Sequence, residues 1–359
     1  MERIKRLQQE LNKKNVQSLL VSSKENLRYF AGFVGSKGYL LITKKKAVFL
    51  TDFRYIESAK KLAPKDIQVV EVEKKLSNFK TILNKYKIKE MGFEDNELSV
   101  LQFKSLKKLA KGVKFRPTYP LLQQIREGKN KAEFKTLAES QKLNEKILQT
   151  VIKKFVRVGV AEEAVAWELE KTARELGAEK MAFPSIVAFG KNSSMPHHDP
   201  GRTKLKKGNI ILVDMGVVYK GYHSDMSRTF FTASPTPEQE KIYNLVLQAQ
   251  EETIAKLKPG ITGKKVDSVA RKLIEKHGFG ENFKHATGHG VGFEIHELPS
   301  FHELYKKKIQ EGAVVTVEPG IYLENKYGVR IEDMVIIEHC GNRNITRFPK
   351  DIKNVIIKV

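Results

Sequence analysis

Two short segments of this 359-residue chain place an acidic residue at matching positions. KKGNIILVDMG (206–216) and QEGAVVTVEPG (310–320) align without a gap, and each carries an acid directly after a run of apolar, mostly β-branched residues. These acids are Asp214 and Glu318. Such runs are typical of buried strands, where an unpaired carboxylate would cost several kcal/mol. Both acids therefore need a partner at the end of their strand.

Three further residues complete a set of candidate metal ligands. Asp225 in YHSDMSRT and Glu332 in GVRIED each follow one of the two segments, and His289 in GHGVGFEIHE lies between them. A single acid would most simply be a surface carboxylate, but four clustered acids repel one another unless a cation lies among them. Oxygen donors with one imidazole suit manganese, iron, cobalt or zinc. The pattern predicts a two-metal hydrolase, with ions roughly 3.5–4 Å apart that share a hydroxide nucleophile.

Four other residues could take part in the chemistry. His197 lies in the loop NSSMPHHDP just before the first ligand strand, a typical place for a catalytic side chain, with His198 as its competitor. His285 and His296 flank the candidate ligand histidine, and each on its own would more simply be a surface or structural histidine. Arg330 precedes the last acid by two residues and would share its strand face. It could orient a ligand, bind substrate or form a structural ion pair.

The elements that must position these residues are duplicated. The segment from residue 158, VGVAEEAVAWELEKTARELGAE, resembles PGITGKKVDSVARKLIEKHGFG, which begins at residue 259, at an offset of 101 residues. The two ligand strands follow at an offset of 104 residues. Each half is predicted to be a helix or two followed by a β-hairpin. Neither half-sheet could bury its inner face alone, so we expect the two to pair into one curved sheet.

The N-terminal part has a different pattern. Over residues 1–122, short apolar strand segments alternate with amphipathic helical segments, which predicts a mixed or parallel sheet covered by helices. Pro117 and Pro120 mark the connection to the second domain, 123–359, which opens with a long amphipathic helix over residues 132–155.

Composition narrows the class of protein. The chain is 40% apolar and 30% charged, and its one cysteine excludes an internal disulfide and a cysteine-based zinc site. We find no signal peptide and no 18-residue apolar run, so a soluble cytoplasmic protein without a membrane partner is expected. The net charge of +23 raises the question of a nucleic-acid partner. The lysines are spread evenly beside apolar residues, which favours a solvated surface and no nucleic acid.

In combination, the motifs PHH, VDMG, SDMSRT, GHGVGFEIHE, TVEPGIY and VRIED resemble the pita-bread metallopeptidases, a family that includes aminopeptidase P, prolidase, methionine aminopeptidase and the metal-free creatinases. The similarity covers about residues 132–359. The preceding domain resembles the creatinase-type N-terminal domain of the proline-specific members. The resemblance implies an α/β creatinase-like domain followed by an α+β pita-bread catalytic domain with an internal pseudo-twofold repeat. It also implies a peptidase acting on Xaa-Pro bonds.

The same resemblance implies a role for each ligand. Asp214 resembles the terminal ligand of one metal, and Asp225 and Glu332 resemble the bridging carboxylates. His289 and Glu318 would complete the second metal, with Glu318 also accepting a proton from the bridging hydroxide. The implied cofactors are two divalent metal ions, Mn²⁺ in the first place, with Co²⁺ or Zn²⁺ as alternatives.

The remaining roles concern the substrate. His197 resembles the histidine that lies seventeen residues before the first ligand, and for this reason it is chosen over His198. Together with His296, it would hydrogen-bond the scissile peptide. His285 would line the proline pocket. Arg330 would support the ligands or contact substrate, and Tyr322 in EPGIY would lie nearby.

Two activities within the family remain open, and the leading expectation is an Xaa-Pro aminopeptidase. The alternative is an Xaa-Pro dipeptidase, which would need an extra cation for the free carboxylate. Some related prolidases have arginine just after the HE-x-P segment, where this chain has Ser300, and this favours the aminopeptidase. A non-catalytic binding protein or a creatinase-like amidinohydrolase would not need five intact ligands. The family likeness also suggests a homodimer.

Overall fold

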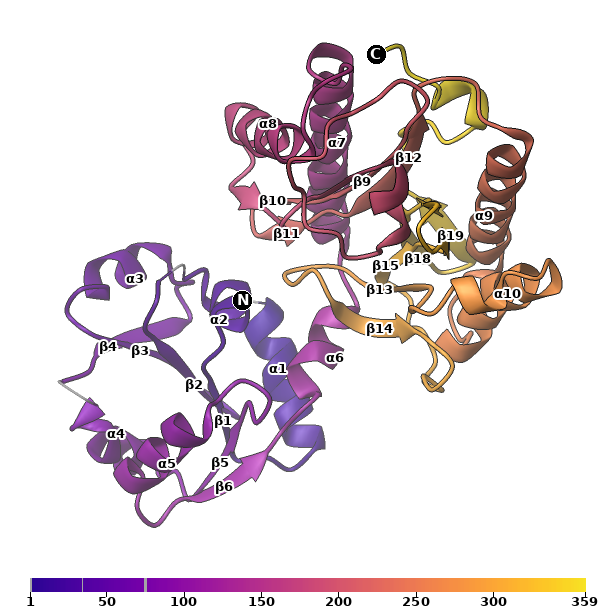
Figure 1. Ribbon diagram of the computed structural model, residues 1–359. Helices are drawn as coiled ribbons and strands as arrows, with labels where there is room; N and C mark the ends of the chain where they lie inside the picture. Colours follow the sequence, from indigo (N-terminus) through magenta and orange to yellow (C-terminus); the bar gives the residue numbers. More distant parts are fainter. Residues whose placement is uncertain (1, 34, 74–75) are drawn as a thin grey trace. The chain divides into compact units, whose positions relative to one another are not determined.

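The computed structural model of the protein describes residues 2–33, 35–73 and 76–359 (Figure 1). The chain divides into two compact units, Met1–Ile125 and Arg126–Val359. This division falls within helix α6 (Leu121–Glu127), close to the connection that the two prolines indicate. Each unit is described by itself.

The first unit is an α/β domain built on a six-stranded sheet with the order β4-β3-β2-β1-β5-β6. β1 pairs antiparallel with β2 and parallel with β5, so the sheet is mixed. Helices and strands alternate along the chain in the expected way: α1 (Glu2–Lys13), β1 (Ser18–Val21), α2 (Lys24–Ala31), β2 (Tyr39–Thr43), β3 (Ala47–Thr51), α3 (Ile56–Leu62), β4 (Ile67–Glu71), α4 (Phe79–Lys85), β5 (Glu90–Phe93), α5 (Val100–Leu109) and β6 (Lys114–Pro117).

The second unit contains two helix-and-hairpin halves. The first half comprises α7 (Lys131–Lys154), α8 (Glu162–Glu175), β7 (Lys180–Met181), β8 (Ile186–Phe189), β9 (Ile210–Met215), β10 (Val217–Tyr219), β11 (Tyr222–His223) and β12 (Met226–Phe231). The second half comprises α9 (Pro237–Lys256), α10 (Gly263–Lys276), β13 (Gly288–Gly290), β14 (Glu297–Phe301), β15 (Val314–Val317), β16 (Gly320–Leu323), β17 (Tyr327–Arg330), β18 (Asp333–Glu338) and β19 (Gly341–Asn344). Short 3₁₀ turns occupy 190–194, 280–282 and 352–354.

The internal repeat is present in the structure. Helices α8 and α10 are each 14 residues long and begin 101 residues apart, as the aligned segments predict. Strands β9 and β15 begin 104 residues apart, and each leads into a hairpin followed by a second long strand. α7 and α8 pack against strands of the first half, and α9 and α10 against strands of the second half (Figure 1).

The sequence predicts that both halves pair into one curved sheet, and here the structure differs. The first half forms the ladders β12-β9-β8 and β11-β10-β7, whereas the second forms β14-β13-β15-β18-β19, with β16-β17 as a separate hairpin. The halves meet at the end of β17, where the backbone N–H of Glu332 donates to the carbonyl of Ser227 at 3.1 Å. Beside this contact a side chain takes the place of a backbone partner: Thr229 donates from Oγ1 to the carbonyl of Arg330 at 3.0 Å and accepts its backbone N–H at 3.1 Å, so the ladder is not continued.

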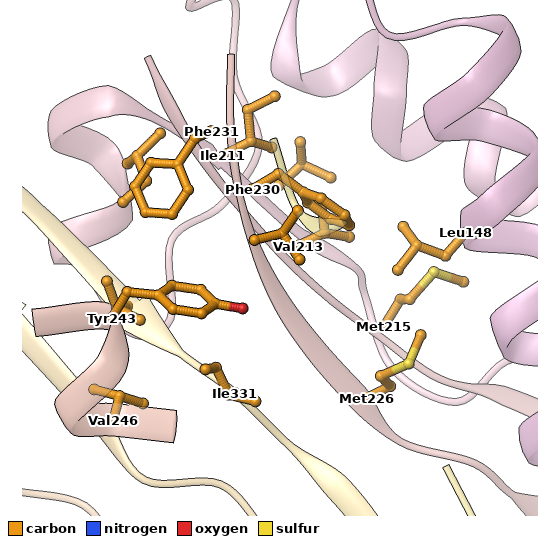
Figure 2. Close-up of a cluster of buried hydrophobic side chains, with 14 of the residues drawn as sticks. Leu148, Ile211, Val213, Met215, Met226, Phe230, Phe231, Tyr243, Val246 and Ile331 are labelled. Carbon is orange, nitrogen blue, oxygen red and sulfur yellow. The ribbon is translucent and has the colours of Figure 1, made fainter. Parts of the chain in front are cut away.

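A large hydrophobic core stabilises the ligand strands from behind. Leu148 of α7 lies beside Met215 and Met226, while Phe231 and Tyr243 pack with ring centroids 5.6 Å apart (Figure 2). All five side chains are at most 2% exposed. The strands that present the acids are therefore anchored on a rigid apolar face, and their polar face is turned to the site.

Candidate metal centre

Asp214 and Asp225 approach the site from neighbouring strands of the first half. Asp214 lies in β9 opposite Ser227 of β12. Asp225 immediately precedes β12, two residues before Ser227, so alternation along the strand puts it on the same face as Ser227. Asp225 is only 4% exposed, and its backbone N–H donates to Gln141 Oε1 at 3.3 Å. The register of β9 and β12 therefore places these two carboxylates on the same face of the sheet.

Glu318 and Glu332 come from the second half. Glu318 directly follows β15, and its backbone N–H donates to the carbonyl of Thr287 at 2.8 Å. Glu332 lies between β17 and β18 and is 1% exposed. Ser227 donates from Oγ to Glu332 Oε2 at 2.8 Å, so a residue of the first half orients a carboxylate of the second.

His289 is held in the tautomer that a metal ligand needs. It lies in β13 between two glycines, and a Cβ at Gly288 would come within 2.1 Å of the Thr316 carbonyl, so that position must lack a side chain. Nδ1 lies 3.0 Å from the Gly290 carbonyl, which can only accept, so Nδ1 carries the proton. The Nε2 lone pair then faces Glu318 Oε1 at 3.4 Å. Burial holds the pKa of His289 at about 4.

The ligand atoms form a compact and electrostatically strained group. Candidate ligand atoms of Asp225, His289 and Glu332 all lie within 4.8 Å of one another. Burial, and then repulsion from Glu332, raises the pKa of Asp225 well above its usual range. Burial, and then Glu318, does the same to the pKa of Glu332. Burial raises the pKa of Glu318 to about 8, although Arg330 opposes the shift.

These residues fit a pair of divalent cations. Carboxylates whose ionisation is suppressed by burial and mutual repulsion are the groups that a cation would bring back to the charged form. Asp214 Oδ1 is buried and has no hydrogen-bond partner among the residues that the structure describes. The donor set of four carboxylates and one imidazole is that of a hard or borderline cation, with no thiolate.

Arg330 connects the cluster of candidate ligands to the residues expected to bind substrate. Its guanidinium donates to Asp214 Oδ2 at 2.6 Å, to Ser227 Oγ at 2.8 Å and to Tyr322 Oη at 2.6 Å. It is 3% exposed. A further donation reaches the carbonyl of Pro196 at 3.4 Å. The structure thus favours the supporting role for Arg330 over a direct contact with substrate.

His285 and Tyr322 form the next part of this network. His285 Nδ1 lies 2.8 Å from the carbonyl of Ala286, so the proton is on Nδ1 and Nε2 accepts from Tyr322 Oη at 3.1 Å. Burial, and then the charge of Arg330, lowers the pKa of His285 to about 4. Its ring packs edge-on against Phe283, with centroids 5.0 Å apart. A neutral, partly apolar wall results.

The other two histidines lie on the open side of the site. His296 packs against the ring of His289, with centroids 4.4 Å apart, and burial lowers its pKa. His197 is exposed on the loop before β9, and its charge contributes to the lowered pKa of both His285 and His296. By contrast, His198 turns away and bonds through Nε2 to Glu162 Oε2 at 2.9 Å.

Comparison with known proteins places this constellation in a family. The model of metallopeptidase family M24 matches residues 135–339, and the creatinase/prolidase N-terminal domain matches residues 3–127. The chain belongs to metallopeptidase family M24. The expected resemblance and fold class, a creatinase-like domain followed by a pita-bread catalytic domain, are therefore confirmed.

Several proteins resemble this peptidase over its whole length. A structure described as an Xaa-Pro dipeptidase from Bacillus anthracis is 36% identical, covers 100% of this chain and 99% of its own, and superposes with a TM-score of 0.94. An Xaa-Pro dipeptidase of Pyrococcus horikoshii is 32% identical over 98% of each chain. An X-Pro aminopeptidase structure from Thermotoga maritima is 32% identical, with coverage of 96% and 98% and a TM-score of 0.89.

Sequence reasoning missed two residues of this peptidase that bond the candidate ligand carboxylates. Ser227 bonds both Glu332 and Arg330, and Thr316 lies with Oγ1 3.4 Å from Glu318 Oε1. Thr316 also accepts the backbone N–H of His289 at 3.0 Å. Each lies two residues from a ligand carboxylate in sequence, so the alternation of strand side chains could have indicated both. No helix in the described part of the chain is long and apolar enough to cross a membrane.

Proposed function

We propose that this peptidase is an Xaa-Pro dipeptidase, which hydrolyses the single peptide bond of dipeptides that end in proline. The main support is full-length similarity to two proteins that carry that name, with the complete ligand set present. Ser300 favours an aminopeptidase from the sequence, and one similar structure bears that name. The aminopeptidase is therefore the second candidate. The two activities differ in whether the α-carboxylate of the proline must be free.

We infer that Asp214, Asp225, His289, Glu318 and Glu332 hold two divalent metal ions, with Mn²⁺ proposed first and Co²⁺ or Zn²⁺ also compatible with the donors. Such ions supply Lewis-acid polarisation of the scissile carbonyl and a hydroxide nucleophile at neutral pH. Arg330 and Ser227 keep the carboxylates in place through the hydrogen bonds described above. These hydrogen bonds should raise the affinity for metal, because the partners of metal ligands fix the orientation of those ligands.

Glu318 is assigned the proton transfer. Its pKa of about 8 in the absence of a cation shows how readily this carboxylate holds a proton near neutral pH. A cation beside it would favour the charged form and lower this pKa, so that Glu318 could accept a proton and release it again. Glu318 would accept a proton from the attacking water and deliver it to the proline nitrogen, which leaves as a secondary amine.

The histidines are assigned to the substrate. An Xaa-Pro bond has no N–H and its ring fixes φ, so the enzyme must recognise the carbonyl and the ring shape. His197 and His296 lie on the open side, where their N–H groups can donate to the carbonyl oxygen as negative charge develops on it. His285, kept neutral and flanked by Phe283, offers a wall suited to the proline ring.

The decisive experiment compares substrates that differ only after the proline. Protein stripped of metal and reloaded with Mn²⁺ would be assayed with Gly-Pro, Gly-Pro-NH₂ and Gly-Pro-Ala, and with Gly-Ala as the control for proline. Losing a charged hydrogen-bonding group costs about 1.5–3 kcal/mol, so we expect kcat/KM for Gly-Pro to exceed that for the amide by at least about tenfold. Equal or faster cleavage of Gly-Pro-Ala would identify the aminopeptidase instead.

A further inference from the structure

One buried carboxylate holds both ends of the segment 189–201, which carries His197. Glu162 is 0% exposed. Its Oε1 accepts from the backbone N–H of Phe189, the last residue of β8, at 2.7 Å and from Asn192 Nδ2 at 2.8 Å, at the start of this segment. Its Oε2 accepts from the ring of His198 at 2.9 Å and from the backbone N–H of Gly201 at 3.2 Å, at the end of the segment. We call Glu162 and His198 the loop clasp.

The clasp is not simply a helix cap. Glu162 is the first residue of α8, and the capping position before it, Ala161, has no side chain that could bond the helix. An acid here benefits from the helix dipole, but a serine or asparagine cap would satisfy the helix ends without a buried charge. Burying a carboxylate is costly unless donors surround it. One of the four donors named above is the last residue of β8 and the other three come from the loop after it, so this carboxylate organises the segment 189–201.

The internal repeat offers a comparison within the same molecule. The position matching Glu162 in the second half is Gly263, the first residue of α10, where Thr262 supplies an ordinary side-chain cap to Lys265. A Cβ at Gly263 would lie 2.1 Å from the carbonyl of Ser300, so this position has no room for a side chain. The half that carries His197 has the clasp, and the other half has a glycine at the matching position.

The clasp acts next to a second anchor of the same loop. Arg330, which also bonds Asp214, donates to the carbonyl of Pro196, the residue before His197. His198, the residue after it, is fixed by Glu162. His197 thus lies between two anchored neighbours, one tied to the metal cluster and the other to α8, while its own ring is exposed.

We propose that Glu162 and His198 are positioning residues that act through His197, holding its ring toward the scissile carbonyl. This inference rests on the proposed function of His197 in Xaa-Pro hydrolysis. Displacement of a catalytic group by about 1 Å can reduce the rate by as much as 10²-fold, so loosening the loop should reduce turnover although no ligand is touched.

The test uses two substitutions of His198 in the full-length, Mn²⁺-loaded protein. His198→Ala removes the clasp, whereas His198→Gln supplies an amide N–H that can replace Nε2 as donor to Glu162. His277→Ala, an exposed histidine at the end of α10, is the matched control. We expect His198→Ala to lower kcat for Gly-Pro by about tenfold or more with little change in KM or metal content. His198→Gln should recover most of this loss, and the control should behave as wild type.

Two further readouts separate positioning from general damage. Hydrogen exchange at residues 190–201 should rise in His198→Ala and stay protected in His198→Gln. In a His197→Ala background, His198→Ala should cause no further loss of kcat, because there is no longer a ring to position. An equal loss in both backgrounds, or unchanged kcat and exchange in His198→Ala, would overturn the proposal. If the wild type cleaves no Xaa-Pro substrate, the proposed function fails, and the exchange measurement alone supports or overturns the clasp.

Discussion

Removing the metal ions should make the stability of this protein fall as the pH rises above neutrality. Without a cation, burial raises the pKa of Glu318 from its ordinary 4.5 to about 8, and burial raises those of Asp225 and Glu332 as well. The folded protein therefore keeps protons that the unfolded chain has already released. Stability falls with pH wherever the unfolded state binds fewer protons than the folded state.

The window from pH 6.5 to 8 isolates this effect. Burial lowers the pKa of His285 and His289 to about 4, so these rings reduce stability mainly as the pH falls from 6.5 toward 4. Above pH 6.5 each ring opposes the decline by only about 0.4 kcal/mol, because the unfolded imidazole is at most half protonated there. One pKa unit corresponds to 1.36 kcal/mol, so Glu318 alone should lower the free energy of unfolding by about 1.5–2 kcal/mol across this window. Asp225 and Glu332 shift in the same direction and would add to the loss.

Urea unfolding at a series of pH values would measure this dependence. Far-UV circular dichroism would follow the transition, because Trp167, the only tryptophan in the chain, is already 68% exposed in the folded protein and its fluorescence would change little. Metal-loaded protein should lack the decline, because bound cations replace the protons and stabilise the folded state by mass action. Glu318→Gln should make the metal-free slope shallower. If the free energy of unfolding of the metal-free protein stayed constant or rose between pH 6.5 and 8, the view that these acids repel one another in the absence of a cation would be refuted.

Two substitutions test the ligand assignments. Asp225→Asn neutralises a proposed bridging oxygen, so activity should be abolished chiefly through loss of metal, measured by elemental analysis; retained metal with full turnover would contradict the assignment. Ser227→Ala removes a hydrogen bond to Glu332 and one from Arg330, and should weaken metal affinity by about 10- to 100-fold while full activity returns at saturating Mn²⁺. Unchanged affinity in a competition titration with a chelator would show that Ser227 does not orient the ligand.

The strand acids illustrate what the sequence can predict. Asp214 and Glu318 follow β-branched runs at matching places of a repeat, so their burial at strand ends could be inferred from local pattern alone. That the two acids lie close together could also be predicted, because each copy of a duplicated unit places one acid at the same buried position and a cation between them would offset their repulsion. The helix boundaries of α8 and α10 also agree with the aligned segments.

Longer-range relationships could not be inferred in this way. The separation of the two halves into distinct ladders depends on strand register and twist, which the apolar pattern does not encode. Glu162 contacts residues 27 to 39 positions away, and nothing at its position distinguishes it from a surface acid at a helix start. The choice of His197 over His198 came from resemblance, whereas the structure gives a physical reason, because His198 is engaged by Glu162.

The central claim, that five residues from the two halves hold two metal ions for peptide hydrolysis, is tested most directly by a metal titration. Metal-free protein would receive Mn²⁺ in known increments while bound metal and the rate of Gly-Pro hydrolysis are measured together. We predict negligible activity without metal and a rate that reaches its plateau at two bound ions per chain. Full hydrolysis by the metal-free protein, or two bound ions without hydrolysis of any Xaa-Pro peptide, would contradict the claim.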